Sequence, residues 1–200
     1  SATSGSTTFA GTITGTGMLS KTGSSTQILS GNNTLGPVAL SAGSLLFNGN
    51  NTTGAVTVSA GTLGGTGSVS GAVTLNGGHL GPGASIGSLG VGSLTLNAGS
   101  ALDIELGAPG NSDLLAINGS LTLNGGSVNL FDVGGLDAGT YTLASYLSEV
   151  GNVSVLGTPV GPSNFNYQLV ASSNLLTLLV TIPGDFDGNG TVDGSDYVSW

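Results

Sequence analysis

The sequence has no cysteine, no arginine and a single lysine, Lys21. Without cysteine there are no disulfides, so stability must come from burial and from backbone pairing. Without clustered lysine and arginine, the chain lacks the side chains that bind phosphate groups. A nucleic-acid partner is therefore not expected, and an anionic membrane surface is disfavoured for the same reason.

Charge of either sign is scarce: 6% of the 200 residues are charged, against roughly a quarter in ordinary globular domains. No stretch approaches the roughly 18 apolar residues of a spanning helix, so membrane insertion is not expected. Disorder is not expected either, because the chain is 38% hydrophobic. The abundant residues are Gly, Ser, Thr, Asn, Val and Leu, which favour strands and turns. An all-β protein is predicted.

A short phrase recurs along the chain: an apolar residue, two small or polar residues, a glycine, a polar residue and another apolar residue. It occurs at 40–45, 58–63, 75–80 and 123–128, and with one extra residue at 96–102. A loose period of this kind is typical of architectures in which similar units stack. The glycines of the phrase are 18, 17, 21 and 27 positions apart: Gly43, Gly61, Gly78, Gly99 and Gly126.

Each repeat has the pattern of two or three short strands joined by tight corners. Alternating segments such as Leu94-Thr95-Leu96 place apolar side chains on one face. The glycine allows a positive φ at the corner, and a second alternating run such as 102–106 begins the next strand. One coil cannot bury its own apolar face, whereas stacked coils bury a shared interior. The sequence therefore predicts a parallel β-solenoid (β-helix), which we assign to residues 1–140.

Three asparagines, Asn76, Asn97 and Asn124, occupy the same place in three repeats. Stacked coils would bring their side-chain amides into a hydrogen-bonded ladder at one corner, as amides form in cross-β structures. The alternative is that asparagine stands there because it tolerates turns. The sequence is compatible with both interpretations.

The repeats resemble the β-strand repeats of autotransporter passenger domains. The resemblance is best over 61–130, in Gly-Thr-Leu-Gly-Gly-Thr-Gly at 61–67, Leu-Gly-Pro-Gly-Ala-Ser-Ile-Gly-Ser-Leu at 80–89 and Asn-Ser-Asp-Leu-Leu at 111–115. It implies a long parallel β-helix displayed outside a bacterial cell, so we expect a secreted, extracellular or cell-surface protein. We also expect a processed or partial chain with a signal peptide upstream, because Ser1 is not a methionine and Trp200 stands where a helix would begin.

Aromatic residues become more frequent after about residue 140. The segments 165–170 and 175–182 flank a four-residue turn, Ala171-Ser172-Ser173-Asn174, and this pattern predicts a β-hairpin. The hairpin either caps the open end of the solenoid or pairs with a neighbouring molecule. We assign residues 141–182 to this segment.

The most specific motif lies in the tail, residues 183–200. Calcium loops of twelve residues have oxygen ligands at positions 1, 3, 5, 7, 9 and 12, and a glycine at position 6. Counted from Asp185, Gly190 stands at position 6, and Val192 at position 8 is expected to pack inward. The sequence predicts a Ca²⁺ site with the ligands Asp185, Asp187, Asn189, Thr191 (through its carbonyl), Asp193 and Asp196.

Two features depart from an EF-hand: Asp196 replaces the usual glutamate, and Pro183-Gly184 replace the incoming helix. Both resemble the dockerin type of calcium repeat, in which the last aspartate is followed by an aromatic residue, here Tyr197. Dockerins carry two such repeats and this chain has one, so a complete cohesin-binding module is not implied. The alternative interpretation is an acidic, glycine-rich tail that holds no ion.

Some parallel β-helices cleave acidic polysaccharides, so catalysis has to be considered. Those reactions rely on Arg or Lys, and the one histidine, His79, stands in a repeat corner where Thr62 and Ser127 stand in other repeats. Asp103 and Glu105 lie two apart on one strand face, as a glycosidase pair would. The leucines and isoleucine that alternate with them should face the core, which turns both acids toward solvent. The sequence therefore predicts that the chain is not an enzyme.

Soluble monomers usually carry many surface charges and blunt their strand edges, and this chain does neither before its acidic tail. We therefore expect a structural protein, a self-assembling subunit of a filament, sheath or surface layer. Its copies would join end to end or strand edge to strand edge into a homopolymer. The alternatives are an adhesin stalk or a fragment of a larger cell-surface binding protein with a glycan or cell-surface partner. A polysaccharide-active enzyme is the least favoured.

Overall fold

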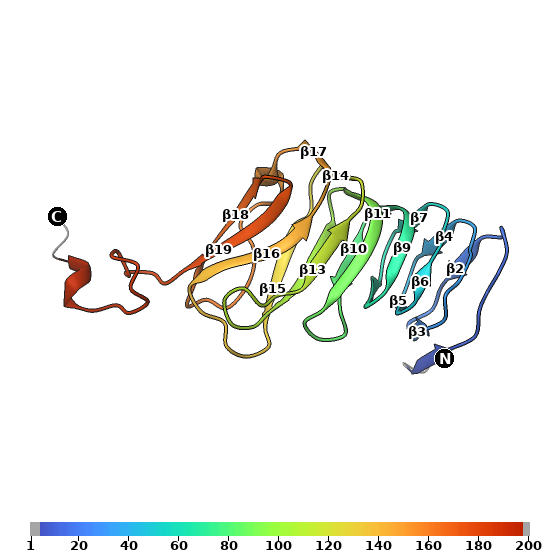
Figure 1. Cartoon of the computed structure of the whole chain (residues 1–200), viewed down its shortest axis with the longest axis horizontal. Helices are drawn as coiled ribbons and strands as arrows, with labels where there is room; N and C mark the ends of the chain where they lie inside the picture. The colour runs from blue at the N-terminus through green and yellow to red at the C-terminus, as the bar shows by residue number, and fades with distance from the viewer. Residues whose placement is uncertain (1–4, 198–200) are drawn as a thin grey trace.

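The computed structural model describes residues 5–197 as an elongated all-β molecule built from two sheets (Figure 1). The prediction of an all-β protein is confirmed. The expectations about Ser1 and Trp200 fall outside the described residues. Helical structure in the described range is confined to two 3-10 turns, η1 (Val153–Leu156) and η2 (Gly194–Tyr197). No helix among residues 5–197 has the length and apolar character needed to cross a membrane.

The first sheet has seven strands, and every neighbouring pair in it is parallel. In spatial order the strands are β1 (Ser6–Phe9), β3 (Thr26–Leu29), β5 (Ser44–Phe47), β8 (Thr62–Gly65), β10 (Gly78–Pro82), β12 (Ser100–Leu106) and β15 (Ser127–Asp132).

The second sheet has twelve strands and is mixed. Its main path runs through β18 (Asn166–Ser172), β19 (Leu175–Thr181), β16 (Gly139–Ser145), β13 (Leu114–Ile117), β11 (Ser88–Leu96), β9 (Ser68–Leu75), β7 (Val56–Val58), β4 (Val38–Leu40) and β2 (Leu19–Lys21). Off this path, β6 (Asn50–Asn51) pairs with β9, β14 (Ser120–Leu123) pairs with β11, and β17 (Ser148–Gly151) pairs with β14.

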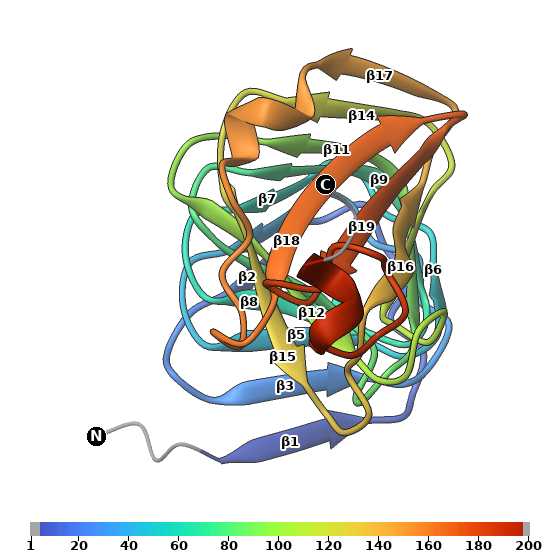
Figure 2. The ribbon, with the colours of Figure 1, turned by 90° about the vertical axis from the view of Figure 1, so that its left-hand side faces the viewer.

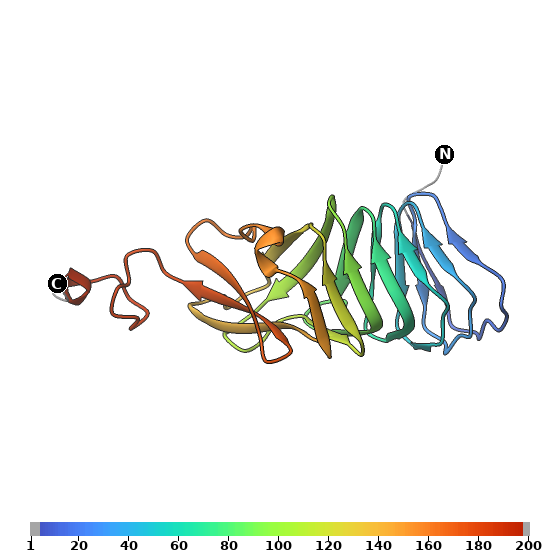
Figure 3. The same cartoon turned by 90° about the horizontal axis from the view of Figure 1, so that it is seen from above.

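From β1 to β16 the chain passes back and forth between the two sheets, and each strand pairs in parallel with its counterpart in the next repeat. Figure 2 shows these strands one behind another, and Figure 3 shows them stacked along the long axis. The stacking follows from the alternating pattern, because every repeat presents its apolar side chains to the same interior.

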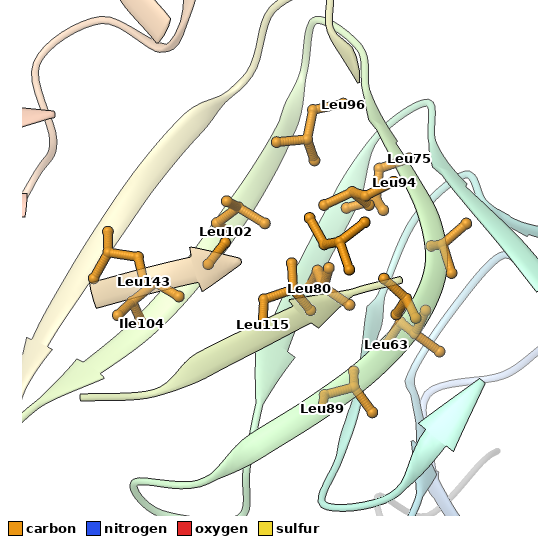
Figure 4. Close-up of a cluster of buried hydrophobic side chains, with 14 of the residues drawn as sticks. Leu63, Leu75, Leu80, Leu89, Leu94, Leu96, Leu102, Ile104, Leu115 and Leu143 are labelled. Atoms are coloured by element: carbon orange, nitrogen blue, oxygen red, sulfur yellow. The ribbon is translucent and has the colours of Figure 1, made fainter. Parts of the chain in front are cut away.

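The core consists of columns of apolar side chains that run through successive strands. In the first sheet Leu63 is in register with Leu80, and Leu80 with Leu102. In the second sheet Leu96 is in register with both Leu75 and Leu123. All six side chains are at most 3% exposed, and Figure 4 shows leucines of both sheets meeting in the interior. Each fully buried leucine contributes about 1.5 to 3 kcal/mol of burial free energy.

Corner geometry agrees with the sequence pattern. The five glycines of the recurring phrase all have φ between 68° and 111°, in the region that residues with side chains rarely adopt.

The asparagine ladder is confirmed: Asn97 Nδ2 donates to Asn76 Oδ1 at 2.8 Å, and Asn124 Nδ2 donates to Asn97 Oδ1 at 2.9 Å. A second amide contact was not predicted. Asn33 Nδ2 donates to Asn51 Oδ1 at 2.7 Å, and both side chains are buried.

The predicted hairpin is present as β18 and β19, but its turn is shorter than expected. Ser172 pairs with Leu175, so the turn consists of Ser173 and Asn174 alone, with φ of 51° and 63°. Two successive positive φ values are the geometry that matches the twist of a hairpin, and this geometry permits the tighter turn. β19 pairs antiparallel with β16, and its residues Leu176 and Leu178 are fully buried. The hairpin therefore covers the C-terminal end of the core.

Candidate metal centre and the outer acidic face

The acidic loop after β19 extends beyond the hairpin at one end of the molecule (Figure 1). Three of the six predicted ligands meet there: carboxylate oxygens of Asp185, Asp187 and Asp196 all lie within 4.8 Å of one another. They come from the beginning and the end of the twelve-residue loop. The loop therefore closes on itself, as a loop that surrounds one ion must.

Asp196 organises this closure. It lies in η2 and is 0% exposed. Its Oδ1 accepts hydrogen bonds from the backbone N–H of Phe186 at 2.7 Å and of Asp187 at 3.3 Å, and its Oδ2 accepts one from the N–H of Asp193 at 2.7 Å. A buried carboxylate is stable only when it is hydrogen-bonded or paired, and here the loop backbone supplies the donors.

Asp185 holds the middle of the loop. Its Oδ1 accepts from the N–H of Gly188 at 2.8 Å, and its Oδ2 accepts from the N–H of Gly190 at 2.9 Å. Gly190 has a φ of 88°, so the glycine at position 6 makes the sharp turn that the motif requires. Asp187 is fixed from the far side, because its Oδ2 accepts from the Ser195 hydroxyl at 2.9 Å.

The other three predicted ligands are not part of this cluster of carboxylates. Asn189 Oδ1 accepts from the N–H and the hydroxyl of Thr191 at 2.8 and 2.6 Å. Asp193 Oδ1 accepts from the hydroxyl and the N–H of Ser195 at 2.7 and 2.8 Å, and these hydrogen bonds lower the pKa of Asp193. The expectation that Val192 packs inward is wrong, because its side chain is 48% exposed. The loop follows an extended strand, so no helix is present to receive that side chain.

The donor set fits a hard divalent cation. Three carboxylates converge on one point, and oxygen is the only ligand atom on offer. The rings of Phe186 and Tyr197 stack edge to face with centroids 6.3 Å apart, which holds the two ends of the loop together. The structure therefore contains a group of carboxylates able to hold a metal ion, at the place where the sequence predicts one.

A second group of acids lies on the outer face of the first sheet. Leu102, Ile104 and Leu106 are buried while Asp103 and Glu105 point outward, as the alternation predicts. His79 lies beside them, a contact that was not predicted: its Nδ1 is 2.8 Å from Asp103 Oδ2. Asp103 Oδ1 in turn accepts from Asn129 Nδ2 at 2.7 Å. The register of β10 with β12 brings the imidazole to the carboxylate.

Asp113 completes this outer group and was not predicted as a functional residue. It is 1% exposed, and it accepts from the N–H of Gly87 and of Glu105, both at 2.9 Å. Burial, reinforced by the charge of Glu105, raises the pKa of Asp113 to about 6. No local pattern marks such a residue, because its two partners lie 26 and 8 positions away.

Fold and site together define an all-β repeat protein with parallel stacked strands and a C-terminal acidic loop able to hold a metal ion. No family model matches the chain. The chain is similar to a protein of Serratia marcescens named Extracellular serine protease, with 35% identity over 120 residues. The matched segment is 59% of this chain, and the chain spans about 11% of the length of that relative.

This similarity corrects the prediction that the chain is not an enzyme, because the matched protein is named a protease. That prediction rested on the shortage of Arg and Lys, the absence of Cys and the corner position of His79. None of these features bears on serine hydrolysis, which uses a serine, a histidine and a carboxylate. The corner position also does not isolate His79, which contacts Asp103. Among residues 5–197, however, no hydrogen bond joins a serine hydroxyl to His79.

Proposed function

We propose that the stacked strands form a parallel β-solenoid that serves as a structural building block outside the cell, extended by head-to-tail contacts between copies. The observation that carries this proposal is the contrast between the two ends. At the C-terminal end the hairpin β18–β19 covers the apolar interior. At the N-terminal end, nothing in the described residues covers it.

The N-terminal end presents apolar surface. All four residues of β1 are exposed, and Phe9 and Met18 are 42% and 68% exposed. Behind them lies a hollow of about 300 Å³ that reaches the core. Its lining is mainly apolar and includes Phe9, Ile13, Leu19, Leu29 and Leu45. Exposed apolar surface of this kind marks a contact site, and we propose that the end of a second copy covers it.

The strand edges also favour head-to-tail contact. The second sheet ends in β2 on one side and in β18 on the other, and neither edge is paired further within the described residues. Unpaired edges are templates for another chain. A contact between the β2 edge of one copy and the β18 edge of the next joins two different surfaces. Such a heterologous contact continues without closing and produces filaments.

Ca²⁺ is the ion we propose for the acidic loop, held by Asp185, Asp187 and Asp196. Calcium prefers several carboxylate and carbonyl oxygens in a flexible arrangement, and the loop offers these donors. The bound ion would supply positive charge that offsets the repulsion among the carboxylates. Because the loop lies beyond the hairpin (Figure 1), its order affects the end of the molecule at which the next copy binds.

Electron microscopy and light scattering of the purified chain test this function, with Ca²⁺ and with a chelator. We expect filaments with Ca²⁺ that fray or shorten when the ion is removed. The variant Phe9→Lys places a charge in the apolar end and should abolish filaments. The matched control is Ala72→Lys, because Ala72 is exposed on β9, which lies between β7 and β11 in the middle of the second sheet.

A monodisperse single chain at high protein concentration with Ca²⁺ present would overturn the assembly proposal. Equal loss of filaments in Phe9→Lys and Ala72→Lys would also count against it, because the effect would then follow the added charge and not the end surface. Far-ultraviolet circular dichroism of each variant confirms that the strands have formed.

The comparison favours a second candidate function, a rigid spacer within a larger extracellular protein. The chain spans about 11% of the relative named Extracellular serine protease, so a similar segment occurs there within a much longer polypeptide. In that case further repeats of the same polypeptide, and not a second copy, would cover the apolar end. Isolated rods that stay single with and without Ca²⁺ would support the spacer and exclude the filament.

A further inference from the structure

A hollow on the outer face of the first sheet arises from two successive glycines. Outward-facing Leu46 on β5 is in register with Gly64 on β8, and Gly64 with Gly81 on β10. On the far side of Gly81 lies Asp103, whose Cβ would be 3.8 Å from a Cβ added at Gly81. The missing side chains leave a gap about two strands, or 10 Å, wide. The resulting hollow has a volume of about 320 Å³.

The walls of the hollow differ in character. Leu46 forms an apolar wall and leans over the floor, since its Cδ2 would be 3.2 Å from a Cβ at Gly64. Phe131, 49% exposed on β15, lines the opposite side beside its register partner Glu105. The loop that contains Ala84 and Ser85 borders one end. The hollow thus has an aliphatic side, an aromatic side and a polar end.

The hollow is acidic, and its three carboxylates outnumber the one imidazole beside them. Asp103, Glu105 and Asp113 line it, and Oε2 of Glu105 is buried without a hydrogen-bond partner among the described residues. A buried charged oxygen that lacks a donor is costly. The one lysine of the chain, Lys21, donates elsewhere, to the carbonyls of residues 22, 23 and 42. Among residues 5–197, His79 is the one basic side chain beside these acids.

We infer that this hollow binds a primary ammonium group on a short apolar stem, the chemistry of a lysine side chain on a partner protein. The methylene groups pack between Leu46 and Phe131, and the ammonium lies near the aromatic ring, where cations are attracted. The ammonium donates to Glu105 Oε2 and to Asp103. A sugar hydroxyl would also satisfy the unpartnered oxygen, but it would leave the negative charge uncompensated. This inference is independent of the assembly proposed above.

Nuclear magnetic resonance titration tests the inference on the Phe9→Lys chain, which is expected to form no filaments. A single chain of about 19.2 kDa gives an assignable amide spectrum. The probe is Nα-acetyl-lysine N-methylamide, and the comparison probes are its Nε-acetyl form, maltose and Ca²⁺. We expect the lysine probe to shift the amides of 81–85, 103–105 and Phe131. The Nε-acetyl form keeps the stem but lacks the charge, so it should shift none of them.

Two variants locate the binding. Glu105→Gln should weaken binding by about tenfold or more, as expected for loss of a hydrogen bond to a charged group. The matched control is Glu149→Gln on β17, which makes the same chemical change outside the hollow and should leave the affinity unchanged. Gly81→Val fills the hollow from its floor and should abolish binding. A Cβ at Gly81 meets its neighbours only at ordinary contact distances, and the amide spectrum confirms folding.

Several results would overturn the inference. If maltose or Ca²⁺ shifts the same amides and the lysine probe does not, the hollow is a sugar site or a metal site. Equal weakening in the Glu105 and Glu149 variants would indicate unspecific attraction to an acidic protein. Absence of shifts with every probe would show that the hollow takes no ligand of these classes.

Discussion

Asp196 and Asp193 differ sharply although both were predicted as calcium ligands. Asp196 is fully buried, and three backbone N–H groups donate to it, two of them from the opening residues of the loop. Asp193 is exposed, and its Oδ1 is occupied by Ser195. Position in a motif therefore does not determine the contribution of a carboxylate. The backbone hydrogen bonds that a carboxylate accepts also determine how much it contributes to the shape of the loop.

We predict that Asp196→Ala lowers the Ca²⁺ affinity of the chain by at least about a hundredfold, because it removes a ligand together with the hydrogen bonds that shape the loop. Asp193→Ala should lower the affinity by less than about tenfold. Isothermal titration calorimetry on the full chain measures both. Equal losses in the two variants would show that Asp193 reaches the ion and that the loop rearranges on binding.

Asp113 makes stability depend on pH. Its folded pKa of about 6 lies above the usual value of 3.8, so the folded state holds the proton more tightly than the unfolded chain does. The stabilisation by this group is complete below about pH 3.8 and is lost as the pH rises through about 6. When the pH falls from 7 to 4, the free energy of unfolding of wild type should therefore rise by about 1 to 2 kcal/mol relative to that of Asp113→Asn. This figure allows for screening by solvent.

Denaturant unfolding of both proteins across this range measures the difference. Asp137→Asn, a change at an exposed acid, is the control and should follow wild type. A stability difference between wild type and Asp113→Asn that does not vary with pH would contradict the raised pKa of Asp113.

At the scale of elements, the asparagine ladder links three successive repeats at one corner. Asn97 takes part in two side-chain bonds, one with Asn76 and one with Asn124, whereas Asn124 takes part in one. Asn97→Ala should lower the free energy of unfolding by about 1 to 2 kcal/mol, and Asn124→Ala by about half as much. Guanidinium denaturation checks the ratio. Equal losses of stability in the two variants would mean that the loss does not depend on the number of ladder hydrogen bonds removed.

Elements that depend on local pattern were predictable from the sequence. Alternation identified the strand faces at 94–96 and 102–106, and glycine identified the corners. The hairpin was also found, although its turn was set two residues too long, because the pairing of Ser172 with Leu175 depends on the backbone twist.

Contacts between repeats were harder to predict. The pair formed by His79 and Asp103 joins neighbouring repeats with an offset of two positions along the strand. Repeats of unequal length, with corner glycines between 17 and 27 positions apart, conceal such an offset. Asp113 is similar, because its role depends on how two loops meet. Three of the predicted metal ligands, Asp185, Asp187 and Asp196, meet, whereas the carboxylate of Asp193 is not in this group, and the spacing alone does not distinguish it from the other three aspartates.

At the scale of the whole molecule, the two ends should differ in local stability. β1 is exposed on all four residues and pairs only with β3 within the described range, whereas β9 and β11 lie between neighbours and carry fully buried side chains. Amide hydrogens of β1 should exchange at least about a hundredfold faster than those of β11 in the single chain. Mass spectrometry or nuclear magnetic resonance measures this. Filament formation should slow exchange in β1 and leave β11 unchanged.

The equivalence of successive strands has a consequence for how such a chain changes over generations. Ser44 pairs with Thr62 and Val38 with Val56, so a cut between residues 38 and 46 has an equivalent point 18 residues further along. An in-frame duplication or deletion of those 18 codons joins equivalent positions and preserves the corners, the columns and both ends. The length of the molecule then varies in steps of about 4.8 Å. The antiparallel strands β18 and β19 follow the repeats. Duplications and deletions among the repeats therefore leave the hairpin and the acidic tail unchanged, whatever the number of repeats.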